Sequence, residues 1–244
     1  MSNNFEKNNQ ATIVGVIDSD LEFSHAVLGE GFYNFTVKVP RLSSESDLIP
    51  VTISERLCGG LKKGDKVAFF GQFRSYNKLV GGKSKLMLTL FVRERLDPET
   101  TSNINEIRLT GYICKEPIFR TTPFGREISD LLVAVNRAYN KSDYLPCIAW
   151  GRNARFSLNL QVGEKIDIIG RIQSRVYQKR IDENTVENRT AYEVSVGSIA
   201  LADMGDALEY SSLTGARTAG AEDYAASNLL NPQAASATFG TNVV

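Results

Sequence analysis

Four large aromatic side chains occupy a stretch of the chain that is also rich in arginine and lysine. The four rings belong to Tyr139, Tyr144, Trp150 and Tyr177. Five cations accompany them, namely Arg137, Arg152, Arg155, Arg175 and Lys179. Flat rings stack on the faces of nucleobases, and cations track the phosphates of a single strand. This mixture therefore predicts a base-stacking surface whose rings contact bases and whose cations contact phosphates.

The segment 144–150, YLPCIAW, alternates in the way expected of a β-strand. One side carries Tyr144, Pro146, Ile148 and Trp150, and the other side carries Leu145, Cys147 and Ala149. The second side is small and apolar, as a side facing a core would be. A strand that packs against a second sheet also carries large rings, so a core role for any single ring is the competing interpretation. The neighbouring cations favour the binding face.

The elements that must position these rings belong to an internal repeat. Residues 12–17, 31–39, 46–50, 61–67 and 71–75 correspond in order to residues 108–113, 128–135, 142–146, 160–166 and 170–174. Both halves share an S-D-x-x-P segment, then a turn glycine, then G-x-x-x-S, and this common order argues against coincidence. Each half shows five or six short strands and at most one short helix, expected near residues 153–160. This pattern predicts a small barrel in each half.

The second half resembles a bacterial single-stranded DNA-binding protein (SSB) domain. The similarity runs through NEIRLTG (105–111), FGREISDLLVAVNRAYNKSDYLPCIAWGRNAR (124–155), VGEKIDIIGRIQSRVYQK (162–179) and AYEVSV (191–196). The resemblance implies a five-stranded OB-fold barrel that binds nucleic acid on the face of its second and third strands and on the loop after the fourth. It also implies stacking roles for Tyr139, Tyr144, Trp150 and Tyr177, which occupy the places of the family's principal aromatics.

Tyr139 shares its alternation parity with the apolar residues Leu131, Val133 and Val135. A regular strand would therefore turn Tyr139 towards the core. To stack on a base it must lie beyond the end of the strand or past a bulge.

The first half resembles the same domain more weakly. Ser43, Leu48 and Ser54 stand in the places aligned with Tyr139, Tyr144 and Trp150, so its stacking face is expected to be lost. The residues left for nucleic acid are Arg74, Tyr76 and Lys78, followed by Lys83 and Lys85. We expect a mostly structural barrel with an accessory electrostatic role.

The fold class expected is all-β, with two tandem OB-fold barrels followed by a disordered C-terminal tail. The expected organisation is a flexible N-terminus (1–10), a degenerate OB-fold domain (11–98), a linker (99–104), an SSB-like OB-fold domain (105–202) and the tail (203–244). The tail is rich in Ala, Ser, Gly, Thr and Asn, as disordered segments are. The chain looks like the SSB architecture that fuses two barrels, which implies a homodimer with four OB folds.

The tail also bears on protein partners. SSBs typically end in an acidic, Pro-Phe-type tip that recruits replication and repair proteins, whereas this chain ends ATFGTNVV. Recruitment of partners by that route is therefore not expected. The tail carries more acids than bases while the whole chain is formally neutral, so the barrels must carry a modest positive excess. Binding should then rest more on stacking than on counterion release, with a shallow salt dependence.

Composition and motifs argue against several other classes. Cys58, Cys114 and Cys147 are scattered without a C-x-x-C pair, so reduced thiols are expected and structural zinc is not. The N-terminus is polar and no apolar run is long enough to span a bilayer, so we expect a cytoplasmic protein without membrane contact.

Catalytic signatures are weak as well. His25 is the only histidine, and the glycine-rich segment 59–64 is followed by Asp65 instead of the lysine of a phosphate-binding loop. Acidic residues are spread among basic ones without metal-ligand spacing. We therefore expect neither an enzyme nor a cofactor.

Three functional hypotheses remain from the sequence. The leading one is a sequence-independent ssDNA-binding protein that coats and protects single strands in replication, recombination and repair. The second is an OB-fold assembly protein of the primosome-accessory kind that acts mainly through protein contacts. The third is an RNA-binding OB protein, since stacking alone does not distinguish RNA from DNA.

Overall fold

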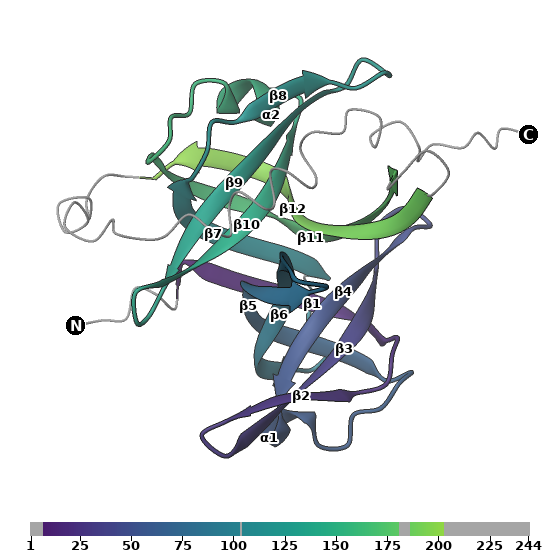
Figure 1. Cartoon of the computed structure of the whole chain (residues 1–244). Coiled ribbons are helices and arrows are strands. Elements are labelled where there is room, and N and C mark those ends of the chain that lie inside the picture. Colours follow the sequence, from purple (N-terminus) through teal and green to yellow (C-terminus); the bar gives the residue numbers. More distant parts are fainter. Residues whose placement is uncertain (1–6, 103, 181–185, 203–244) are drawn as a thin grey trace, which may run out of the picture.

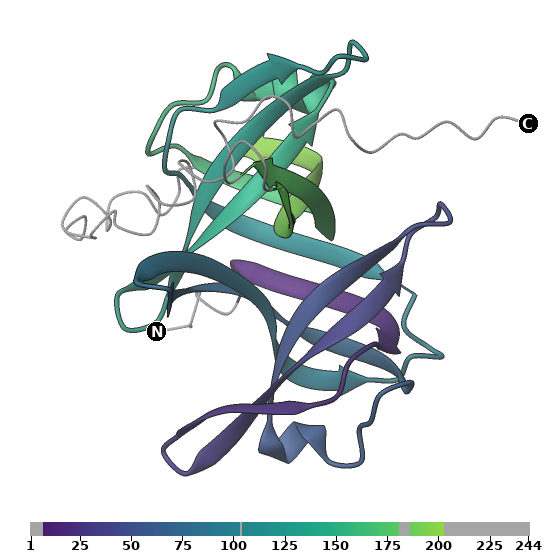
Figure 2. The ribbon, with the colours of Figure 1, turned by 45° about the vertical axis from the view of Figure 1, so that its right-hand side comes forward.

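The computed structural model describes residues 7–102, 104–180 and 186–202. Within these residues the chain forms twelve strands, all joined in one sheet that curls into two barrels. Figures 1 and 2 show the barrels one above the other, with β1 and β7 side by side between them.

The two halves carry the same succession of elements. The first barrel contains β1 (Asn9–Ile17), β2 (Glu22–Val27), β3 (Glu30–Pro40), β4 (Ser46–Ser54), α1 (Glu55–Cys58), β5 (Lys66–Val80) and β6 (Lys83–Leu96). The second contains β7 (Asn105–Ile113), β8 (Ile118–Thr121), β9 (Glu127–Arg137), β10 (Lys141–Trp150), α2 (Arg152–Ser157), β11 (Lys165–Arg180) and β12 (Val186–Leu201). The repeat read from the sequence is therefore a repeat of structure.

Each barrel closes through its first strand. β1 pairs with both β3 and β5, and β7 pairs with both β9 and β11. The alternating apolar residues of these strands point inward, and they include fully buried Ile13 and Phe73 in the first barrel and Val133 and Ile166 in the second. Burial of this apolar surface is the main force that holds each barrel closed.

A β-bulge bends the long fifth strand of each half at a glycine. The register shifts at Phe70/Gly71 in β5 and at Ile169/Gly170 in β11. A Cβ atom at Gly71 would collide with the carbonyl oxygen of Phe91, and one at Gly170 would collide with that of Ser195. The first residue of each G-x-x-x-S segment is therefore glycine because the neighbouring strand passes too close for a side chain.

The two barrels are joined edge to edge by β1 and β7. These strands are antiparallel, with Asn9 opposite Leu109, Ala11 opposite Ile107 and Ile13 opposite Asn105. Asn9 and Asn105 are counterparts in the repeat, as are Ile13 and Leu109. The pairing therefore has an approximate two-fold symmetry centred on Ala11 and Ile107.

The fold class predicted from the sequence is confirmed, with corrections of detail. Each half has six strands, within the expected five or six and one more than the five-stranded barrel that the resemblance implies, because a short strand, β2 or β8, precedes the central pair. Each half also has one short helix, and that of the first half, α1, lies outside the one region where a helix was located from the sequence. β5 and β11 are long, with 15 and 16 residues, because each continues beyond its own barrel. Figure 2 shows the β5–β6 hairpin arching towards the second barrel.

The N-terminal boundary also differs from the expectation. Asn9 and Gln10 belong to β1, within the segment 1–10 that we expected to be flexible, because they pair with Leu109 and Arg108 of β7. The predicted tail, 203–244, lies outside the described residues. No helix among the described residues is long and apolar enough to cross a membrane.

Candidate nucleic-acid interface

The outer face of β9 and β10 carries two of the predicted rings. Trp150 lies opposite Ile128, and Tyr144 lies opposite Ala134 on the neighbouring strand. Trp150 is 38% exposed and Tyr144 is half-buried, with its phenol pKa raised by that burial. Six residues of extended chain separate the two rings by about 20 Å along the strand. This spacing leaves room for more than one nucleotide between them.

The alternation predicted for β10 holds on the core side. Leu145, Cys147 and Ala149 belong to the buried core. Pro146 and Ile148, on the same side as the rings, are buried too, so other parts of the chain cover the strand between Tyr144 and Trp150. The two rings, at the ends of this covered stretch, are therefore the groups on this side of β10 that can stack on bases.

Tyr139 lies beyond the end of β9, in the turn that leads to β10. Its φ of 62° is in the left-handed region, and its side chain is 93% exposed. The left-handed backbone breaks the alternation that would have turned the ring inward. Tyr139 therefore lies past the end of the strand, as the sequence requires if its ring is to stack on a base.

Tyr177 lies on the part of β11 that extends beyond its own barrel. Arg175, Tyr177 and Lys179 follow one another on the same side of this strand. The guanidinium of Arg175 lies 5.7 Å from the centre of the Tyr177 ring. The extended part of β11 packs against β4 of the first barrel, so Tyr177 reaches out from the barrel that carries the other three rings.

Three of the five predicted phosphate ligands are ion-paired within the chain. Arg137 lies 3.3 Å from Asp143, Arg155 donates to Glu127 at 2.6 Å, and Arg175 lies 3.5 Å from Glu193. Arg152 is exposed and Lys179 is half-buried, and neither forms an ion pair within the described part of the chain. These two have their charge available without breaking an internal pair.

The accessory residues of the first barrel share one side of β5. Arg74 donates to Gln72 at 2.8 Å and lies over the Phe91 ring at 3.9 Å. Burial, and secondly the nearby charge of Arg137, lower the pKa of Arg74 to about 10. Tyr76 is 44% exposed and Lys78 is exposed. Arg74 is thus held by its own barrel, whereas Tyr76 and Lys78 lie on the extended hairpin.

The extended strands also bind the opposite barrel through a pair of equivalent contacts. In the first, which we term the β10 contact, the Ser75 amide donates to Asp143 Oδ1 at 2.7 Å and the Tyr144 amide donates to Ser75 Oγ at 2.8 Å. In the second, the β4 contact, the Ser174 amide donates to Asp47 Oδ1 at 2.7 Å and the Leu48 amide donates to Ser174 Oγ at 2.9 Å. The S-D-x-x-P and G-x-x-x-S segments of the repeat are therefore partners of each other.

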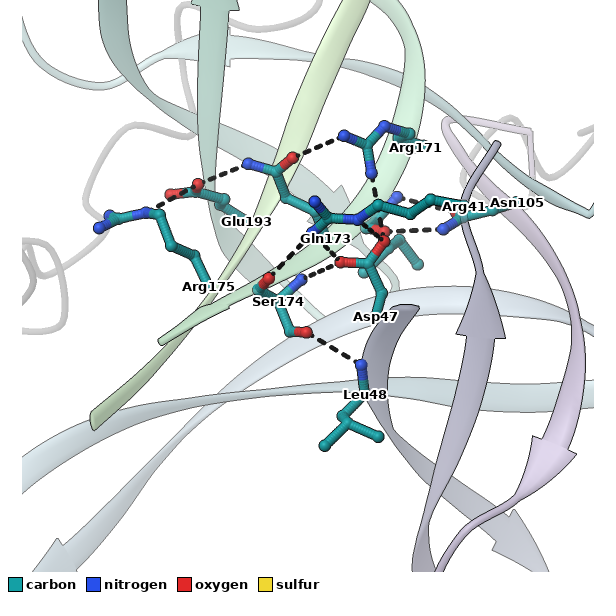
Figure 3. A network of polar contacts seen from close by, with 10 residues as sticks. Arg41, Asp47, Leu48, Asn105, Arg171, Gln173, Ser174, Arg175 and Glu193 are labelled. Carbon is teal, nitrogen blue, oxygen red and sulfur yellow. Dashed lines mark hydrogen bonds and ion pairs between the residues drawn. The ribbon is translucent and has the colours of Figure 1, made fainter. Parts of the chain in front are cut away.

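The carboxylate of the β4 contact is fully satisfied (Figure 3). Arg41 donates to both of its oxygens, at 2.9 and 2.6 Å, and Arg171 donates to Oδ2 at 3.2 Å. Beside it, Gln173 donates to Glu193 at 2.7 Å, and Glu193 is the partner of Arg175. Bidentate arginine pairs of this kind are among the stronger polar interactions in proteins.

The carboxylate of the β10 contact is less well satisfied. Asp143 Oδ2 and Arg137 Nε are both buried, and neither has a hydrogen-bond partner, although they form an ion pair. Burial raises the pKa of Asp143, and this effect outweighs the opposing influence of Arg137 and the Ser75 amide. A poorly paired buried carboxylate therefore lies next to Tyr144.

The corresponding face of the first barrel lacks the rings, as the sequence indicated. Its centre is filled by a hydrogen-bonded cluster in which Thr52 donates to Asn34 at 2.8 Å and meets Thr89 at 2.9 Å. Ser54, which replaces Trp150, lies opposite Phe32, a ring that is buried and stacked on His25. This face satisfies its own polar groups.

Cysteine and metal chemistry have little support in the described residues. The cysteines are free, and burial raises the pKa of the Cys114 thiol to about 11. No group of three or more His, Cys, Asp or Glu side chains is arranged to hold a metal ion within the described ranges. What the geometry offers is a surface for stacking and phosphate contacts.

Comparison with known proteins places the chain in a family. Residues 104–202 match the model of the single-strand binding protein family. The chain is 32% identical over 81 residues to Single-stranded DNA-binding protein B of Bacillus subtilis, a match that covers 30% of this chain and 72% of that protein. It is also 32% identical over 84 residues to the Single-stranded DNA-binding protein of Clostridium tetani, covering 32% of this chain and 58% of that protein.

Other relatives are matched over about half of their length, for example 52% and 49% in two further cases. The crystal structure of the single-stranded DNA binding protein from Thermus aquaticus has a TM-score of 0.62 with 18% identity, covering 81% of this chain and 94% of that chain. That likeness extends the shared fold over both barrels. The two-barrel chain described here therefore belongs to the single-strand binding protein family.

Proposed function

We propose that this chain is a non-catalytic, sequence-independent ssDNA-binding protein that coats and protects single strands in replication, recombination and repair. The observation that carries the proposal is the outer face of β9 and β10, where Tyr144 and Trp150 lie on one side of β10 and Tyr139 projects from the adjoining turn. Rings spaced along an OB barrel can stack on successive bases without reading their sequence.

In this proposal the cations around these rings contact the phosphates. Arg152 and Lys179 are the primary candidates because their charges are not committed to a carboxylate within the described ranges. Arg137, Arg155 and Arg175 contribute where a phosphate competes with their present partners. Lys78 and Tyr76, on the first-barrel hairpin, add an accessory contact. The site needs no metal or cofactor, because stacking and charge neutralisation are sufficient for binding.

The proposed assembly is a homodimer, in which two chains supply four OB folds. The proposed location is the cytoplasm, where replication and repair expose single strands.

A second candidate function is an OB-fold assembly protein that acts mainly through protein contacts. It is favoured by exposed apolar side chains on the β2–β3 hairpin of the first barrel, where Phe23 is 63% exposed and Leu28 is fully exposed. Exposed apolar side chains on a projecting hairpin are available for contact with another protein.

Fluorescence of the single tryptophan, Trp150, separates the two candidates. We expect strong quenching on titration with oligo(dT), little change with duplex DNA of equal length, and only a shallow loss of affinity when salt is raised. A matched RNA oligonucleotide tests the RNA-binding alternative in the same format. No quenching by oligo(dT), together with no shift in a gel assay, would favour the assembly protein.

A further inference from the structure

One edge of β10 is left open by its own barrel at Tyr144. β9 covers the other edge along the whole strand, from Lys141 to Trp150. β12 pairs with the open edge only at Cys147 and Ile148. The Tyr144 amide points out of this edge, and its hydrogen bond is the one to Ser75 Oγ at 2.8 Å. The backbone that carries a stacking ring is therefore held by a residue of the first barrel.

Ser75 is itself fixed in place. It is 5% exposed, its amide donates to Asp143 Oδ1 at 2.7 Å, and its hydroxyl lies 3.5 Å from the same oxygen. These two hydrogen bonds, to neighbouring residues of β10, form a clamp that fixes the open edge of the strand against the first barrel at this point. An amide on a strand edge that has no such partner exchanges hydrogen bonds with water, and the strand moves more freely.

We propose that Ser75 is a positioning residue for Tyr144, so that the first barrel, although it has lost its own rings, completes the ssDNA site of the second. This inference rests on the proposed function and adds a residue from the other half of the chain to it. The clamp keeps the Tyr144 ring at the spacing from Trp150 that stacking requires. Without it the ring must be ordered when DNA binds, which weakens binding.

The molecule provides a matched control. Ser174 makes the same two hydrogen bonds to Asp47 and Leu48, but Leu48 carries no ring. Ser75→Ala and Ser174→Ala thus remove the same hydroxyl from equivalent contacts. We expect both to lower the unfolding midpoint by similar amounts. Ser75→Ala should also weaken oligo(dT) binding, by about threefold to tenfold, the change expected when one hydrogen bond is lost, and by more than Ser174→Ala does.

A double-mutant cycle distinguishes positioning from a general structural effect. In a Tyr144→Ala background, Ser75→Ala should weaken binding no further, because the ring it positions is gone. In a Trp150→Ala background its effect should remain at full size. A loss of stability alone would act equally in both backgrounds. Equal effects in the two backgrounds, or equal effects of Ser75→Ala and Ser174→Ala on binding, would overturn the inference.

The outcomes separate this inference from the proposed function. If the wild type fails to bind oligo(dT), the proposed function is wrong and the inference falls with it. If the wild type binds oligo(dT) and Tyr144→Ala weakens that binding, the proposed function stands, and the double-mutant cycle alone tests whether Ser75 positions Tyr144. Should Ser75→Ala not fold, hydrogen exchange of the wild type decides: a protected Tyr144 amide supports the clamp, and a rapidly exchanging one contradicts it.

Discussion

The β4 contact and the β10 contact join the same pair of barrels through the same residue types, yet they differ in how well they are satisfied. Asp47 receives hydrogen bonds from Arg41, Arg171 and the Ser174 amide. Asp143 accepts only from Ser75, through its amide and, at 3.5 Å, its hydroxyl, and its second oxygen has no hydrogen bond. The well-satisfied contact lies beside Leu48, and the poorly satisfied one lies beside Tyr144.

This difference follows the division of roles between the two faces. A contact that serves only to join the barrels gains from complete pairing of its buried charges. At the β10 contact, next to Tyr144, Arg137 Nε and Asp143 Oδ2 form an ion pair at 3.3 Å but make no hydrogen bond. Proteins tend to depart from full satisfaction of polar groups at functional sites, and here the departure lies on the side of the proposed DNA site.

The largest expected effect is on the free energy of unfolding, when the carboxylates of Asp47 and Asp143 are replaced one at a time. Asp47→Asn should lower the free energy of unfolding by about 2–4 kcal/mol, because it leaves two arginines without their partner. Asp143→Asn should cost clearly less, because the lost charge is poorly paired and the amide oxygen can still accept from Ser75. Urea unfolding followed by far-UV circular dichroism measures both. Equal losses would remove the distinction between the two contacts.

For the affinity for oligo(dT) we expect the reverse order: the side chain beside the β10 contact should matter more than the one beside the β4 contact. Tyr144→Ala should weaken oligo(dT) binding by about 1–3 kcal/mol, the value of one stacked base. Leu48→Ala, its counterpart in the first barrel, should leave the affinity nearly unchanged. Fluorescence anisotropy of a labelled oligo(dT) reports on both variants. A comparable loss for Leu48→Ala would show that the first barrel's face binds DNA directly.

A smaller effect should appear in the pH dependence of stability. Burial raises the pKa of Asp143 in the folded chain above its ordinary value of 3.8. Between the unfolded and folded pKa values the folded state holds the extra proton, so stability falls as the pH rises through that window. Asp143→Asn cannot lose a proton there.

The difference in unfolding free energy between Asp143→Asn and the wild type should therefore shift in favour of the variant as the pH rises from about 4 towards the raised pKa. Urea unfolding at a series of pH values tests this. A difference that is constant with pH would show that Asp143 titrates normally in the folded protein.

The sequence alone determined the repeat, the barrel class and the two sides of β10. These follow from local rules: alternation assigns Leu145, Cys147 and Ala149 to the core, and the glycines at positions 71 and 170 mark backbones that pass closely. The parity argument for Tyr139 was also local, and it required the residue to lie past the strand end, where the structure places it.

Only the tertiary structure decided which residues meet across the barrels. Alternation predicts the side of the strand on which Ser75 or Asp143 lies, but not the residue that it contacts. That residue comes close only because both barrels close and β1 pairs with β7. The same reason explains the arginines. Their spacing predicted phosphate ligands, whereas the fold brings Glu127, Asp143 and Glu193 beside three of them.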